Sequence, residues 1–136
     1  MKTLVLYYSY SGHAKKLAEA CAKKKKADIA EIKDANRPGT LGAYLKGCPA
    51  AIKGKSWLIQ PIDADLAAYD SLILYSPVWA GNPPPAVNAA LKRIPRGKDV
   101  AVYMVSRSGT SKCRARLEEL VAAKGSKLAG FNDLKG

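Results

Sequence analysis

The sequence predicts an α/β fold, a doubly wound parallel sheet of five strands in the order 2-1-3-4-5, within one domain spanning residues 1–136. Short apolar runs, typical of buried strands, alternate with stretches of helical periodicity along the chain. Such alternation builds strand–helix–strand units, whose right-handed crossovers make the sheet parallel. A length of 136 residues with 48% hydrophobic residues suits a single core.

The composition excludes several classes of protein. No apolar run approaches the ~20 residues of a membrane span and no signal-peptide pattern follows Lys2, so we expect a cytoplasmic protein without a membrane span. A single histidine and three separated cysteines argue against a metal site. The net charge of +12 indicates acidic partners or a plain solvated surface, and no motif for specific nucleic-acid binding accompanies it.

The order of elements follows from periodicity and from the residues that begin and end helices. Lysines 23–26 suit the negative end of the first helix, residues 83–85 are prolines that pre-set a helix start, and Gly125 suits a helix end. After a strand that begins at Thr3, we expect a helix over residues 12–26, a strand over 27–33, one or two short helices within 40–53, a loop over 54–65, a strand over 69–76, a helix from 85 to 94, a strand over 99–106, a helix over 113–125 and an edge strand over 127–132.

Two details of this scheme matter later. The apolar face of the first helix is expected to contain Ala14, Leu17, Ala18 and Cys21. Only four residues follow Asn132, so the helix that usually ends such a fold is missing from the sequence. Three explanations stay open: a second subunit in a homodimer covers that face of the sheet, the earlier helices cover it, or the chain is incomplete.

Polar loops follow the first and third strands, on either side of the point where the strand order reverses. Ligands bind at such a switch point in open α/β sheets. The first loop leads directly into a helix, whose free N–H groups at Gly12, His13 and Ala14 suit an anion, and Ser9 and Ser11 add hydroxyl donors. This turn is too short for a nucleotide-binding P-loop, so a phosphate monoester fits it better.

These loops resemble those of the flavodoxin family. The stretch SYSGHAKK is similar to the family's SxTGNT phosphate loop, and YDSLILYSPVWAGNPPPAV is more similar still to its second loop. The resemblance extends from residue 2 to about residue 131 and implies an FMN cofactor at the switch point. The chain departs from the family pattern at His13 and at Ala14, which has no hydroxyl, and the lost donor weakens phosphate binding by about 1 kcal/mol.

The second and third loops are expected to hold the flavin ring. Trp79 lies among Pro, Gly and Asn, where an indole has little reason to pack, so we expect it to stack on the ring, whereas Trp57 is expected to be a packing residue. The third loop has no tyrosine to cover the second face of the ring. Arg107 either offers a cation that would raise the reduction potential or points into water, and the sequence leaves both open. The predicted cofactor-binding residues are Ser9, Tyr10, Ser11, Gly12, His13, Ala14, Pro77, Val78, Trp79, Ala80, Gly81, Asn82, Ser106, Arg107, Ser108 and Gly109.

The sequence therefore predicts an FMN-binding redox protein that transfers electrons between a reductase or reduced nicotinamide, NAD(P)H, and an acceptor. No catalytic acid–base pair or nucleophile can be assembled, so the chemistry would be that of the cofactor. The positive charge predicts a redox partner with an acidic surface. The alternative is a binding module without redox function that holds another phosphate-containing ligand in the same cleft.

Overall fold

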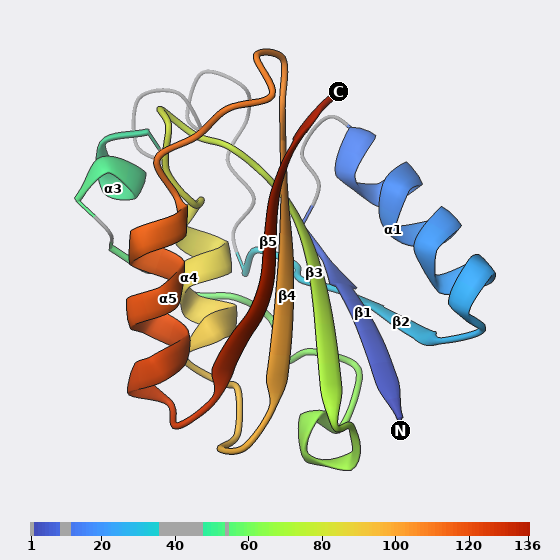
Figure 1. Cartoon of the computed structure of the whole chain (residues 1–136). Coiled ribbons are helices and arrows are strands. Elements are labelled where there is room, and N and C mark those ends of the chain that lie inside the picture. Colours follow the sequence, from blue (N-terminus) through green and yellow to red (C-terminus); the bar gives the residue numbers. More distant parts are fainter. Residues whose placement is uncertain (1, 9–11, 36–47, 54) are drawn as a thin grey trace.

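The computed structural model describes residues 2–8, 12–35, 48–53 and 55–136. Five parallel strands form one sheet in the order β2-β1-β3-β4-β5, which confirms the predicted topology (Figure 1). The strands are β1 (Thr3–Tyr7), β2 (Asp28–Glu31), β3 (Ser71–Pro77), β4 (Asp99–Ser106) and β5 (Lys127–Lys135).

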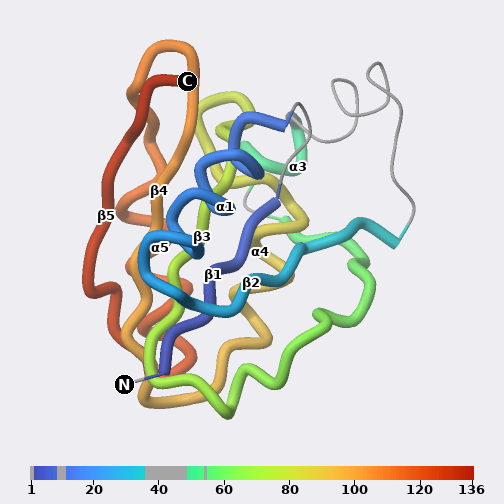
Figure 2. The backbone as a smooth tube through the Cα atoms, turned by 90° about the vertical axis from the view of Figure 1, so that its right-hand side faces the viewer, coloured from blue at the N-terminus to red at the C-terminus, as the bar shows by residue number. Residues whose placement is uncertain are grey.

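Helices cover both faces of this sheet. The long helix α1 lies on one face and packs against β1, β2 and β3, and the view in Figure 2 shows it in front of β1 and β3. Helices α4 and α5 lie on the opposite face, with α3 beyond their ends at the carboxyl edge of the sheet (Figure 1). The bounds are α1 (His13–Lys25), α3 (Cys48–Ile52), α4 (Pro85–Leu91) and α5 (Arg114–Ala123), with a short 3-10 helix, η2 (Leu66–Ala68), before β3.

Local sequence explains where these helices begin and end. Pro84 caps α4 in an extended conformation and Pro85 is its first residue, where a missing N–H costs nothing. Three lysines occupy the last turn of α1, next to its unsatisfied carbonyl groups. Gly125, after α5, has φ +74°, a value that suits glycine at a helix end.

The buried face of α1 differs from the predicted one. Ala14, Ala18 and Ala22 are buried, whereas the side chain of Leu17 is 36% exposed and so lies outside the core. Alanines spaced four residues apart form a flat stripe, which lets the helix backbone approach the strands closely. The prediction that Leu17 is buried was wrong, because helical periodicity does not show how closely the helix approaches the sheet.

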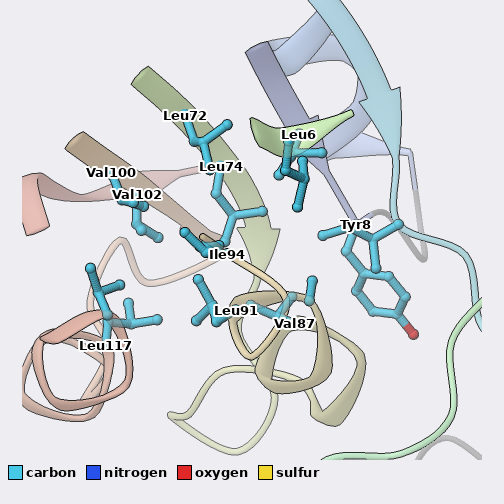
Figure 3. Packing of buried hydrophobic residues seen from close by; sticks show 14 of the residues in the cluster. Leu6, Tyr8, Leu72, Leu74, Val87, Leu91, Ile94, Val100, Val102 and Leu117 are labelled. Atoms are coloured by element: carbon cyan, nitrogen blue, oxygen red, sulfur yellow. The ribbon is translucent and has the colours of Figure 1, made fainter. Parts of the chain in front are cut away.

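Two hydrophobic clusters lie on the two faces of the sheet. The cluster beneath α4 and α5 is the larger and is formed mostly by aliphatic side chains of the strands and helices, as Figure 3 shows. Tyr8 lies at its margin with its hydroxyl pointing away from the aliphatic side chains. The smaller cluster contains Val5, Tyr7, Ala14, Ala18, Ala22, Ile73, Tyr75 and Val105.

The edge strand β5 is longer than the sequence predicted. It continues past Asn132 to Lys135, and the N–H of Gly136 still donates to the carbonyl of Ser106 at 2.8 Å. None of its residues is fully buried, so polar side chains are tolerated throughout and hydrophobicity did not mark the end of the strand. In the part of the chain that the structure describes, no helix is long and apolar enough to cross a membrane.

Candidate functional site

The predicted loops follow the carboxyl ends of β1, β3 and β4, three adjacent strands in the centre of the sheet. Of the first loop, Ser9, Tyr10 and Ser11 lie outside the described residues. Gly12 precedes α1 in a left-handed conformation, with φ +99°, and among the described residues no side chain caps the helix there. The carbonyl of Gly12 accepts the first helical bond from Lys16 at 3.2 Å.

The first turn of α1 therefore presents free donors. Within the described residues, the N–H groups of His13, Ala14 and Lys15 donate to no acceptor. The imidazole of His13 is exposed, whereas the methyl group of Ala14 is buried against the sheet. This end of the helix is suited to an anion, since both its dipole and its free N–H groups point there.

The loop after β3 is a tight turn. Trp79 and Asn82 exchange two backbone hydrogen bonds, at 2.9 and 3.0 Å, around Ala80 and Gly81. Both central residues have positive φ, +51° at Ala80 and +79° at Gly81, as in a type I′ turn. Glycine adopts this conformation freely, but for Ala80 it costs about 1 kcal/mol.

The carbonyl groups of this turn are all engaged. Gly81 accepts from the N–H of Lys112 at 2.7 Å, and Ala80 accepts from the side-chain amide of Asn82 at 2.9 Å. By contrast, the N–H groups of Ala80 and Gly81 have no acceptor among the described residues. The turn therefore offers two adjacent donors.

Arg116, which sequence reasoning missed, braces the turn from α5. Its guanidinium donates to the side-chain oxygen of Asn82 at 3.1 Å and to the carbonyls of Ala51 and Ile52 in α3 at 2.7 and 3.2 Å. It thereby ties together three segments that are distant in sequence. Nothing in the sequence distinguishes this arginine from the neighbouring Arg114, whose side chain pairs instead with Glu118 on the helix surface.

Trp79 belongs to an aromatic cluster. Its half-buried indole makes edge-to-face contacts with Tyr8, at a centroid distance of 5.9 Å and an angle of 63°, and with Trp57, at 5.7 Å and 72°. Trp57 is half-buried and packs against the core, as expected of a packing residue. The cluster fixes the ring of Trp79 at the carboxyl edge, and its stacking on a flavin remains a prediction.

The loop after β4 is bonded mainly to itself. Ser106 Oγ accepts from the N–H of Gly109 at 3.1 Å, and Ser108 Oγ accepts from the N–H of Thr110 at 3.3 Å. Gly109 has φ +72°, which a turn of this shape requires. Arg107 is exposed beside these hydroxyls, and its proximity to a cofactor remains a prediction.

Charge and burial distinguish the groups around these loops. Arg107, Lys112 and Arg114 are exposed near the carboxyl edge, and the one ion pair among the described residues is that of Arg114. Cys113 is fully buried with its thiol 3.6 Å from the carbonyl of Gly81. Burial raises the pKa of this thiol to about 11, so it stays protonated and unreactive at neutral pH.

Comparison with known proteins shows one family that matches nearly the whole chain. The family model described as NADPH-dependent FMN reductase matches residues 1–129. No protein of curated function matches the sequence significantly. The family match and the structural matches below confirm the predicted flavodoxin-like fold and FMN as the cofactor.

Solved structures show the same architecture. A flavoprotein from Lactobacillus acidophilus, solved in complex with FMN, is 26% identical over 96% of this chain and 91% of that chain, with a TM-score of 0.69. A protein from Bacteroides uniformis superimposes at a TM-score of 0.79 with 21% identity, over 96% of this chain and 87% of the other. Flavodoxin 1 from Bacillus cereus, at 20% identity, covers all of this chain and 86% of its own, with a TM-score of 0.54.

Proposed function

Since this chain belongs to the NADPH-dependent FMN reductase family, we propose that it binds FMN at the carboxyl edge of the sheet and transfers electrons from a reductase or NAD(P)H to an acceptor. The similar Lactobacillus acidophilus flavoprotein was solved with FMN bound, which supports the same ligand here. When bound, FMN supplies the capacity to accept a hydride from a nicotinamide and to release one or two electrons.

The observation that carries this proposal is the position of the free backbone donors. One set lies at the first turn of α1 and the other at Ala80 and Gly81, and these follow the adjacent strands β1 and β3. The phosphate would be held by the first set together with Ser9 and Ser11. The polar edge of the ring would accept hydrogen bonds from the second set, with Trp79 against the face of the ring.

The third loop and the exposed cations near it would determine which partners reach the flavin ring and how tightly they bind. The third loop, residues 106–110, contains no aromatic side chain, so one face of the ring stays open to a nicotinamide or a small acceptor. Exposed Arg107, Lys112 and Arg114 would attract an acidic redox protein. Electron transfer to such a protein should slow as the salt concentration rises, and a rate independent of salt would contradict this partner.

The first test is a titration of the apo-protein with FMN and with riboflavin, followed by flavin fluorescence. We expect tight FMN binding with strong quenching, weaker binding of riboflavin, and weaker quenching by Trp79→Ala. Replacing Ser9 and Ser11 together by alanine should lower the affinity for FMN and leave that for riboflavin unchanged. Each lost hydroxyl should weaken FMN binding about fivefold.

Two further assays distinguish a reductase from an electron carrier. Steady NAD(P)H oxidation with a small acceptor would identify a reductase, and activity only with a separate reductase and an acceptor protein would identify an electron carrier. Absence of FMN binding would reject the redox function and favour the alternative, a module that binds another phosphate-containing ligand.

A further inference from the structure

A buried carboxylate lies behind the aromatic cluster at the carboxyl edge. Asp34 follows β2 and is only 7% exposed. Its two oxygens have different partners: Oδ2 accepts from the hydroxyl of Tyr8 at 2.7 Å and Oδ1 accepts from the indole N–H of Trp57 at 2.8 Å. The bond from the Tyr8 hydroxyl has the usual length of an O–H···O hydrogen bond, and the bond from the Trp57 indole is slightly shorter than the usual N–H···O bond, so both oxygens are well bonded.

The backbone on either side of this carboxylate is also fixed. Asp34 forms an antiparallel bridge with Ile59, in which Gln60 donates its N–H to the carbonyl of Lys33 at 2.8 Å and Ala35 donates to Leu58 at 3.2 Å. The side chain of Gln60 adds a bond to the carbonyl of Asp34 at 3.2 Å. The loop that contains Trp57 is thus held against the end of β2.

Both partners of Asp34 contact the same third ring. Tyr8 and Trp57 each make an edge-to-face contact with the indole of Trp79, at centroid distances of 5.9 and 5.7 Å. The carboxylate is therefore connected to Trp79 by two arms, each consisting of one hydrogen bond and one aromatic contact. Two such contacts restrict the orientation of the Trp79 ring more than one contact would.

The free energy needed to bury the Asp34 carboxylate indicates that the exact positions of its two aromatic partners matter. Burying a carboxylate is unfavourable unless its oxygens are well hydrogen-bonded, and the described residues provide Asp34 with no ion pair. Two neutral donors stabilise the charge only while both rings keep their positions. The same bonds therefore hold Tyr8 and Trp57 in one arrangement.

We propose that Asp34 is a positioning residue, which through Tyr8 and Trp57 sets the orientation of the Trp79 indole that receives the flavin ring. The part of this inference that concerns flavin binding rests on the proposed function, whereas the part that concerns the orientation of Trp79 does not. A ring fixed before the cofactor binds avoids the entropy cost of ordering it during binding. Asp34 would thus contribute to the affinity for the isoalloxazine ring and not to that for the phosphate.

The test uses Asp34→Asn, which keeps the shape of the side chain but removes the charge and one acceptor. Trp57 and Trp79 are the only two tryptophans of the chain, so an indole–indole exciton couplet in circular dichroism comes from this pair. We expect this signal to decrease in the apo-protein. We also expect the affinities for FMN and riboflavin to fall by the same factor, about fivefold.

The chain contains a matched control at the other end of β2. Asp28 accepts from the hydroxyl of Tyr69 at 2.7 Å, the same kind of bond at the same distance as that of Asp34 with Tyr8. Asp28→Asn should leave the indole signal and both flavin affinities unchanged. If Asp34→Asn does not fold, Tyr8→Phe paired with Tyr69→Phe provides the same comparison without altering a carboxylate.

The outcomes separate this inference from the proposed function. An unchanged indole signal in Asp34→Asn and Tyr8→Phe overturns the inference, as does a loss of affinity for FMN alone. If the wild-type protein binds neither flavin, the proposed function fails, and the indole signal still decides whether Asp34 orients Trp79.

Discussion

The two loops after β3 and β4 lie side by side at the carboxyl edge but are held in different ways. The turn at residues 79–82 is braced from outside, by Lys112 and Arg116 and by the aromatic cluster around Trp79. The loop at residues 106–110 is held chiefly by its own serine hydroxyls. A braced turn suits a fixed orientation of a bound ring, whereas a self-bonded, exposed loop can adjust to a ligand or a partner.

Arg116→Ala is expected to have the largest effect on the stability of the fold. The substitution removes three hydrogen bonds of a charged donor and separates Asn82 from α3. We expect the free energy of unfolding to decrease by about 3 kcal/mol, measured by urea denaturation. The control is Arg114→Ala, whose exposed ion pair with Glu118 contributes only about 0.5 kcal/mol. Similar losses in both variants would show that the turn does not depend on this brace.

The next largest effect on stability compares one glycine of positive φ from each loop, Gly81 and Gly109. In Gly81→Ala the new methyl group meets only the side chain of Lys112, at 3.9 Å, so the cost of about 1–2 kcal/mol is that of the backbone alone. In Gly109→Ala the methyl group lies 3.3 Å from Cβ of Lys135. If the loop at residues 106–110 can adjust, it moves away from Lys135 and relieves this contact. Both variants then lose the same free energy of unfolding.

Thermal denaturation monitored by circular dichroism measures this difference. We expect the two free energies of unfolding to agree within about 0.5 kcal/mol. A markedly larger loss in Gly109→Ala would show that the loop after β4 is as rigid as the braced turn, which would remove the contrast between them.

The pH dependence of stability tests the burial of the Cys113 thiol next to the braced turn. Burial raises the pKa of Cys113 from 9.0 to about 11, so the unfolded chain loses this proton first. Stability from this group is complete below pH 9 and declines as pH rises toward 11, by about 1 kcal/mol from pH 9 to about pH 10. The wild-type curve should fall more steeply than that of Cys113→Ala over this range. Parallel curves would contradict the burial of the thiol.

The sheet and its order were predictable because the evidence for them is local and repeated. Each buried strand is a continuous apolar run, and β4 was predicted with its observed bounds, Asp99–Ser106. The position of the loops follows from topology, so the predicted residues of the second and third loops lie at one edge. Such features depend on periodicity and on connection rules and need no knowledge of side-chain contacts.

The interactions between segments were not predictable in this way. Asp34 and Arg116 look like ordinary surface charges in the sequence, yet one is buried beneath aromatic rings and the other joins α5 to α3. Each acts across more than twenty residues of sequence, at distances where periodicity carries no information. The only local hint was composition: Trp57, Trp79 and Tyr8 are aromatic residues that need partners for their polar atoms.

The smallest expected effect concerns the strained residue of the braced turn. Ala80 has φ +51°, and Ala80→Asn creates the Asn-Gly pair that type I′ turns prefer. We expect a gain of about 0.5 kcal/mol in the free energy of unfolding. Ala80→Gly should be nearly neutral, because the relief of strain is offset by the greater entropy of the unfolded chain. Measured together with flavin affinity, the pair shows whether the strain has a function. If Ala80→Asn stabilises the fold but weakens FMN binding, an alanine at this position keeps the N–H groups of the turn accessible to the ring at the expense of stability.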